Sequence, residues 1–213
     1  NHLLAINKPA GLPTMGARPG EHSVVEVAKE YLREKYHKPG NVFLGIVSRL
    51  DEPVTGVLLF ARTSKAAGRL AKQFRERTTQ KTYWAIVAGH PRPQQAELVD
   101  WLIKNDRERR SDLVAPHTER AKEARLSYEI LREYPKHSLL QIELETGRKH
   151  QIRAQLSSRG HAILGDRKYG SREAFPFGIA LHARWLSVLH PVSYQPSDLT
   201  ARLPASWAAW DVS

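Results

Sequence analysis

The 213-residue sequence contains no cysteine. This absence excludes disulfide bonds, thiolate zinc sites and a cysteine nucleophile, and it suits a reducing compartment. The sequence also lacks any run near the 18 or more apolar residues of a membrane-spanning helix, and its first residues lack the basic start and long apolar core of a signal peptide. We therefore expect a cytoplasmic protein without a membrane partner.

Acidic residues are too few to balance the basic ones. The chain has 33 Lys and Arg against 22 Asp and Glu, a formal net charge of +11. Such an excess favours a polyanionic partner, because Lys and Arg that neutralise phosphates release condensed counterions. Charges of both signs make up 26% of the chain and 41% of it is hydrophobic, so the excess belongs to a folded body with one core. We expect a single domain over residues 1–213 and no internal repeat.

Apolar spacing and turn residues predict the elements of this domain. The uninterrupted apolar run Val57–Ala61 is typical of a strand buried on both faces. Ser23 and Glu26 form the sequence pattern of a capping box, which predicts a helix that ends before Pro39. Further strands are predicted at 3–6, 83–88, 126–131 and 138–144, and further helices from a cap at Ser64 and over 148–159.

The charged stretch 104–125 has no clear apolar period. It predicts an exposed loop or ribbon, with solvated surface as the simpler interpretation and RNA contact as the alternative. Strand and helix patterns are mixed along the chain rather than regularly alternating. They favour an α+β fold in which helices flank a mixed, largely antiparallel central sheet.

Asp51 is the first candidate for a chemical role. It lies in the segment 48–56, directly ahead of the strand predicted to be buried on both faces. Pro53 and Gly56 indicate a turn, and functional side chains are often presented by loops anchored to rigid structure. On these residues alone, an aspartate with only a turn or capping role explains the position equally well.

Arg153 and Tyr83 are two further candidates. Arg153 borders the inward side of the helix predicted over 148–159, and desolvating a guanidinium is costly unless a carboxylate meets it. Asp51 is a suitable partner, and the alternative is an arginine that extends to the surface along its alkyl stem. The ring of Tyr83 can pack in the core, or it can be a flat surface on which a base stacks, a contact worth roughly 1–3 kcal/mol.

Taken together, several motifs resemble those of the RluA-type family of RNA pseudouridine synthases. Each is short and weak alone, but they occur in the family's order over most of the chain. The motifs are NKPAGL from Asn7, RLD and TGVLL around Asp51, KTYWA around Tyr83, TGRKHQIR ending at Arg153, GHAILGDRKYG from Gly160, LHA from Leu181, and His190-Pro191. The resemblance implies a single pseudouridine synthase-like domain.

The resemblance also implies an activity and four residue roles. The enzyme would isomerise uridine to pseudouridine in structured ribosomal or transfer RNA, with the target base flipped out of its stack. Asp51 would be the catalytic carboxylate, and Arg153 would pair with it. Tyr83 would stack on the base and help to move a proton, and Arg49 would hold the RNA. The isomerisation involves no redox change and no group transfer, so no cofactor is expected.

This sequence departs from the family's usual pattern at two positions. Ser48 stands where histidine is usual before Arg49, and Val54 stands where threonine is usual. The sequence shows no separate RNA-binding module ahead of Asn1, of the kind that many relatives carry. We expect a monomeric catalytic domain; either the protein consists of this domain alone, or such a module precedes Asn1 in a longer protein.

Two other functions are compatible with parts of the sequence. The first is a catalytically silent RNA-binding protein on the same fold, which would not need a carboxylate among basic residues. The second is a metal-dependent nuclease with His150, His161 and Asp166 as ligands, but their spacings of eleven and five residues match no compact metal motif. We expect no metal.

Overall fold

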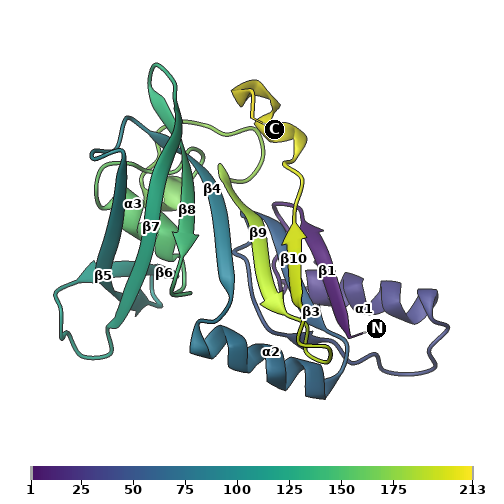
Figure 1. Ribbon diagram of the computed structural model, residues 1–213. Coiled ribbons are helices and arrows are strands. Elements are labelled where there is room, and N and C mark those ends of the chain that lie inside the picture. Colours follow the sequence, from purple (N-terminus) through teal and green to yellow (C-terminus); the bar gives the residue numbers. More distant parts are fainter. Residues whose placement is uncertain (1, 213) are drawn as a thin grey trace.

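The computed structural model describes residues 2–212 and shows one ten-stranded sheet with helices packed against it (Figure 1). Its strands are β1 (Leu3–Lys8), β2 (Gly45–Ile46), β3 (Thr55–Ala61), β4 (Gln80–Ala88), β5 (Gln95–Asn105), β6 (Arg110–Val114), β7 (Lys122–Glu133), β8 (His137–Leu144), β9 (Leu181–Leu189) and β10 (Pro196–Thr200). Its helices are α1 (Val24–Lys35), α2 (Ser64–Glu76) and α3 (Gln151–Ser157), with 3-10 turns η1 (Arg167–Tyr169) and η2 (Ala205–Trp210).

The strand order is β1-β3-β9-β4-β8-β7-β5-β6, with β10 on β9 and β2 on β3. Among the described residues, every pairing of named strands is antiparallel except the parallel pair β3–β9. The expected α+β fold with a mixed, largely antiparallel sheet is therefore confirmed. Within residues 2–212, no helix is both long and apolar enough to cross a membrane.

Strand β3 lies between two layers of apolar side chains. Leu58 and Phe60 pack into the large core that also holds the buried face of α1. Val57 and Leu59 point the other way, into a cluster with Leu70 of α2. Successive side chains of a strand alternate between its faces, so only a continuous apolar run can fill both layers. The predicted double burial is confirmed.

Both long helices begin at side-chain caps. Ser23 accepts a hydrogen bond from the Glu26 backbone N–H, and the Glu26 carboxylate accepts one from the Ser23 N–H at 2.6 Å, so the capping box is confirmed. The predicted cap of α2 was wrong by one residue. Thr63 is the N-cap and accepts from the Ala66 N–H at 3.2 Å, while Ser64 is the first helical residue.

The stretch 104–125 is a ribbon of paired strands more than a loop. It contains the end of β5, all of β6 and the start of β7, joined by turns. The ribbon form of the prediction is therefore confirmed, although the stretch is not exposed throughout, since Ser111 and Ala124 are buried. The strands escaped prediction because their inward positions hold small or polar residues rather than a regular apolar series.

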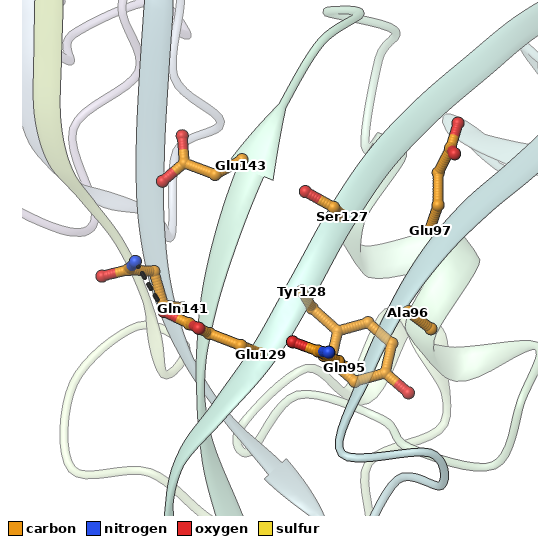
Figure 2. A pocket seen from close by; sticks show the side chains of 8 residues that line it. All are labelled: Gln95, Ala96, Glu97, Ser127, Tyr128, Glu129, Gln141 and Glu143. Carbon is orange, nitrogen blue, oxygen red and sulfur yellow. Dashed lines mark hydrogen bonds between the residues drawn. The ribbon is translucent and has the colours of Figure 1, made fainter.

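The central strands have two chemically different faces. Tyr83 pairs with Ile142, whereas Thr82 and Trp84 pair with Glu143 and Gln141 on the opposite face. A hollow on that opposite face lies over β5, β7 and β8 and is lined by acidic and amide side chains (Figure 2). Three of them are the glutamates Glu97, Glu129 and Glu143. This hollow therefore carries acidic side chains, although the protein as a whole is strongly basic.

Candidate active site

The loop that carries Asp51 is held by its backbone. The Thr14 hydroxyl donates to the Leu50 carbonyl at 2.9 Å and accepts from the Leu50 N–H at 3.1 Å. The Ile179 N–H donates to the Pro53 carbonyl at 3.2 Å, and the Val54 N–H donates to the carbonyl of Asp51 itself at 3.0 Å. The loop therefore keeps its position without using the Asp51 carboxylate, which stays free for chemistry.

A buried lysine adds a further restraint that sequence reasoning missed. Lys8, at the end of β1, is 0% exposed. Its ammonium donates to three carbonyls, those of Pro9 at 2.7 Å, Leu12 at 2.9 Å and Glu52 at 3.0 Å, and so uses all its protons. Burial lowers the pKa of Lys8 to about 8, against the opposing fields of Asp51 and Glu52. The signal in the sequence was its place in the NKPAGL motif, which resembles a family motif but to which no residue role was assigned.

Arg153 lies at the floor of the site between two carboxylates. Its Nη1 donates to Asp51 Oδ2 at 3.0 Å, so the predicted contact between the two residues is confirmed. Its Nε and Nη2 donate to Asp166 Oδ2 and Oδ1 at 2.6 and 2.8 Å, a bidentate pair. Burial opposes the charged guanidinium, but the two carboxylates more than offset it and raise the pKa of Arg153. Asp166 therefore anchors Arg153, and Arg153 in turn orients Asp51.

The helix that carries Arg153 is shorter and more buried than predicted. The sequence predicted a helix over 148–159, whereas α3 comprises Gln151–Ser157, and all its residues except the last are buried. The preceding residue, His150, has a left-handed backbone with φ +53°. A helix without a polar outer face gives no clear period in the sequence, and this explains the misplaced start.

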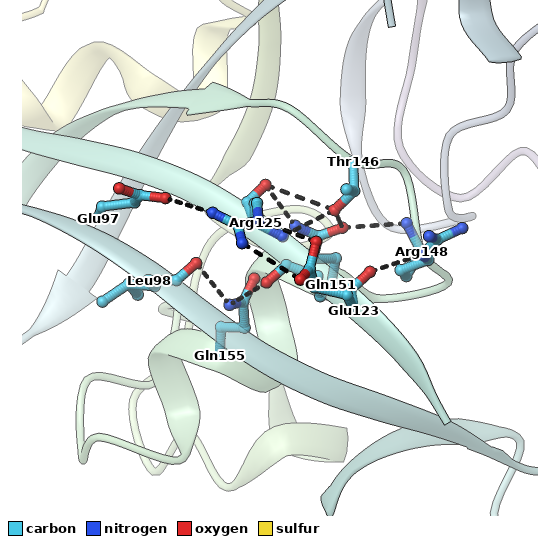
Figure 3. A network of polar contacts seen from close by, with 9 residues as sticks. Glu97, Leu98, Glu123, Arg125, Thr146, Arg148, Gln151 and Gln155 are labelled. Carbon is cyan, nitrogen blue, oxygen red and sulfur yellow. Dashed lines mark hydrogen bonds and ion pairs between the residues drawn. The ribbon is translucent and has the colours of Figure 1, made fainter. Parts of the chain in front are cut away.

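A polar network ties the start of α3 to β7 (Figure 3). The Thr146 hydroxyl and the Arg148 N–H donate to Gln151 Oε1 at 2.7 and 3.1 Å, and Gln151 Nε2 donates to the Arg125 carbonyl at 2.9 Å. Arg148 Nε donates to the Glu123 carbonyl at 2.9 Å. Because these bonds satisfy buried polar groups on both sides, they fix the turn that presents His150 and Arg153.

The four predicted site residues line one cleft with a volume of about 870 Å³: Arg49, Asp51, Tyr83 and Arg153. Tyr83 and Leu144 line it from β4 and β8, and exposed Arg49 lies at its rim. Burial, and then the Asp51 carboxylate, raise the pKa of the Tyr83 hydroxyl, which therefore stays protonated at neutral pH. Eight basic side chains line the cleft: Arg49, Arg75, Arg77, Lys81, Lys104, Arg148, Lys149 and Arg153.

Comparison with known proteins identifies the family of this chain. A family model described as RNA pseudouridylate synthase matches residues 2–158. The chain is 34% identical to the dual-specificity RNA pseudouridine synthase RluA of Escherichia coli K12, over 97% of this chain and 91% of the relative. The chain belongs to the RNA pseudouridylate synthase family. Its resemblance to RluA-type members is confirmed.

Two further relatives extend the comparison. An uncharacterized RNA pseudouridine synthase of Synechocystis is 35% identical over 95% of this chain, and the chain spans 63% of that relative's length. The fold is shared with the human RNA pseudouridylate synthase domain containing 4, with a TM-score of 0.82 at 24% identity over 97% of this chain and 89% of the other.

The histidines considered as metal ligands lie apart in this synthase. His150 faces Asp51, whereas His161 Nδ1 lies 2.9 Å from the Ala88 carbonyl. Asp166 is occupied by Arg153. Within residues 2–212 no three His, Asp or Glu side chains are grouped as metal ligands. The geometry gives the nuclease interpretation no support.

Another buried histidine joins the two parallel strands behind Asp51, and it predicts a pH dependence. His182 is 0% exposed, with Nδ1 2.7 Å from the Thr55 hydroxyl and Nε2 3.3 Å from the Ala201 carbonyl. Burial lowers its pKa to about 4. The imidazole of His182 takes up a proton near pH 6.5 in the unfolded chain, but only near pH 4 in the folded protein. His182 therefore lowers the free energy of unfolding as the pH is lowered from 6.5 to 4, by up to about 1.4 kcal/mol per pH unit.

Urea unfolding of wild type and His182→Gln between pH 7 and pH 5 measures this effect. The stability of wild type should fall more steeply, because the variant has lost one of the residues that titrate. Parallel curves for the two proteins would contradict the role given to His182.

Proposed function

We propose that this chain isomerises uridine to pseudouridine in structured RNA. The observation that carries the proposal is the Asp51 carboxylate, held by buried Arg153 and facing Tyr83 across a basic cleft. Asp51 attacks or stabilises the sugar carbon when the glycosidic bond breaks, and the ring of Tyr83 receives the extruded base. Arg153 holds Asp51 in position, and Arg49 contacts the RNA at the rim. Residues 1–213 act as the catalytic domain, and they need no cofactor or metal.

The distribution of charge supports binding of RNA on the cleft side. Four acidic residues, Asp51, Glu52, Asp106 and Glu145, face the eight basic ones in the cleft. The opposite face of the sheet carries the three glutamates of Figure 2. Phosphates are attracted to the first surface and repelled from the second, so the field orients the RNA before any specific contact forms.

Arg77 provides a test of this electrostatic contribution. It is exposed at the rim of the cleft, and its field lowers the pKa values of Lys81 and Arg148, after burial as the main cause. Arg77→Gln should weaken RNA binding. It should also reduce the steepness of the plot of log affinity against log salt concentration by about 1, the change expected when one phosphate contact is lost. Lys136→Gln, in the β7–β8 turn at the far end of β8, is the control with the same loss of charge and should leave the slope unchanged.

Filter binding or fluorescence anisotropy measures the slopes of wild type and both variants. Salt concentrations of roughly 50 to 300 mM are suitable, because counterion release dominates the affinity in this range. Equal slopes for wild type and Arg77→Gln would show that this part of the rim is not in contact with the RNA.

The substrate class is the finer part of the proposal. Relatives are named a dual-specificity RNA pseudouridine synthase and a ribosomal large subunit pseudouridine synthase. We propose ribosomal or transfer RNA as the substrate, and a monomer that acts in the cytoplasm. Ribosomal and transfer RNA from cells that lack the enzyme, incubated with the purified protein, should gain pseudouridine at specific positions. Tight binding without any new pseudouridine would favour the silent RNA-binding protein instead.

A further inference from the structure

His150 lies beside Asp51, and none of the roles above uses it. Its Nε2 is 3.7 Å from Asp51 Oδ2, and its side chain is 9% exposed against 26% for Asp51. Its Nδ1 is 3.0 Å from the Tyr169 hydroxyl, with the two rings nearly perpendicular. The imidazole therefore lies between the reactive carboxylate and a buried tyrosine, within hydrogen-bond distance of the tyrosine and within ion-pair distance of the carboxylate.

The hydrogen bonds of Tyr169 decide where the proton of this imidazole lies. The Tyr169 hydroxyl accepts from the Ser111 N–H at 2.8 Å and lies 3.0 Å from the Ser111 carbonyl, on edge strand β6. A tyrosine hydroxyl has one proton. If it donates to the buried Ser111 carbonyl, its remaining lone pair accepts from His150 Nδ1–H, and every group in the chain is satisfied. If the Tyr169 hydroxyl instead donated to His150 Nδ1, the buried Ser111 carbonyl would lose this hydrogen-bond donor, which costs free energy.

Neutral imidazole carries a single proton, so a proton on Nδ1 leaves Nε2 bare toward Asp51. Burial is the main cause that lowers the pKa of His150 to about 4, so the ring is neutral at physiological pH. Charged and titratable groups facing the ring include Asp51, Lys149, Arg153, Asp166 and Tyr169. The lone pair of a neutral imidazole next to a carboxylate is a proton acceptor.

We propose that His150 is a positioning residue for proton transfer, which accepts from Asp51 the proton that the uracil ring loses. This inference rests on the proposed function. In uridine C5 bears hydrogen and N1 bears the sugar, whereas in pseudouridine C5 bears the sugar and N1 bears hydrogen. The C1′–N1 and C5–H bonds therefore break, and the C1′–C5 and N1–H bonds form.

His150 acts at the C5–H step. When the C5–H bond breaks, its electron pair restores the C5–C6 double bond and the proton passes to Asp51 Oδ2. Transfer from there to Nε2 returns Asp51 to its ionised form and prevents the proton from going back to C5. The imidazolium then releases a proton to the solvent, and N1 takes one up, so protons balance. Asp51 touches the substrate, and His150 acts through it.

The tautomer can be measured on the wild-type protein without RNA. Nitrogen-15 NMR of the imidazole rings distinguishes a protonated from a bare ring nitrogen, and His150 is identified from the backbone assignment. We expect the proton on Nδ1 at pH 7. A proton on Nε2 would overturn the proposal, whatever the kinetics show.

Kinetics with RNA that carries deuterium at C5 of the target uridine tests the transfer itself. His150→Gln retains an amide that can reach Asp51 but cannot accept a proton. Single-turnover pseudouridine formation should slow by at least about 100-fold, the scale of a general acid–base contribution. A primary isotope effect should emerge, or grow over that of wild type, because removal of the C5 proton now limits the rate. His161→Gln, which changes a histidine beyond the C-terminal end of α3, beside the Ala88 carbonyl, should match wild type in rate and isotope effect.

Rescue of turnover by an added base distinguishes loss of the proton acceptor from a structural effect of the substitution at His150. His150 has φ +53°, so His150→Gly is compatible with the backbone and leaves space beside Asp51. Added imidazole should restore turnover in proportion to its neutral fraction. A slow glutamine variant with an unchanged isotope effect and no imidazole rescue would refute the role of His150 alone. If wild type makes no pseudouridine, the proposed function itself fails, and this role fails with it.

Discussion

Asp51→Asn should abolish pseudouridine formation while leaving the fold and RNA binding nearly intact. The substitution keeps the shape of the side chain and removes its charge, so the carboxylate that acts on the sugar is lost. We expect turnover to fall by about 10⁴-fold or more, the scale seen when charged members of catalytic sets are removed. The free energy of unfolding should change by no more than about 1 kcal/mol, because the carboxylate is 26% exposed and the loop is held by its backbone.

A neighbouring carboxylate gives the matched control. Glu52 lines the same cleft, and the lysine that holds this loop binds its carbonyl rather than its side chain. Glu52→Gln should therefore turn over at close to the wild-type rate. Because uridine and pseudouridine have the same mass, turnover should be measured by chromatographic separation of the two nucleosides after digestion of the RNA. Thermal unfolding and RNA affinity should be measured for the same three proteins. Substantial turnover by Asp51→Asn would show that another group does the chemistry.

The sequence was informative where one local rule decides the structure. The capping box of Ser23 and Glu26 and the doubly buried run Val57–Ala61 were both predicted, since each depends on residues close together in the chain. The loop position of Asp51 followed in the same way from Pro53 and Gly56. Gly56 has φ +115°, and a Cβ there would lie 2.3 Å from the Ala183 carbonyl oxygen, a contact that only the folded sheet reveals.

The sequence was less informative where distant segments meet. The Arg153–Asp51 contact was predicted because a buried arginine needs a carboxylate, but this rule does not say how many carboxylates it has. Asp166 lies 13 residues along the chain from Arg153, was considered only as a metal ligand, and is the better buried partner. Lys8 escaped notice for the same reason, since its three carbonyl partners are assembled by the fold. Burial of polar groups by distant chain segments leaves no periodic trace in the sequence.

The two carboxylates that bind Arg153 should contribute very differently to stability. The Asp166 side chain is 1% exposed, so loss of Arg153 leaves its charge buried without a partner, whereas the Asp51 side chain is 26% exposed and can be hydrated. Arg153→Met should therefore destabilise the protein by about 3–5 kcal/mol, the usual cost of breaking a buried pair. Most of this cost comes from Asp166 and little from Asp51.

Double-mutant cycles in urea separate the two contributions. Arg153→Met combined with Asp166→Asn leaves no stranded charge, so the pair should be more stable than the sum of the single changes by about 2 kcal/mol or more. Arg153→Met combined with Asp51→Asn should come within about 1 kcal/mol of additivity, as for a partly exposed ion pair. A larger coupling with Asp51 than with Asp166 would mean that the reactive carboxylate, and not the buried one, anchors Arg153. In that case every change at Asp51 would also disturb the fold, and the loss of turnover in Asp51→Asn would no longer report on chemistry alone.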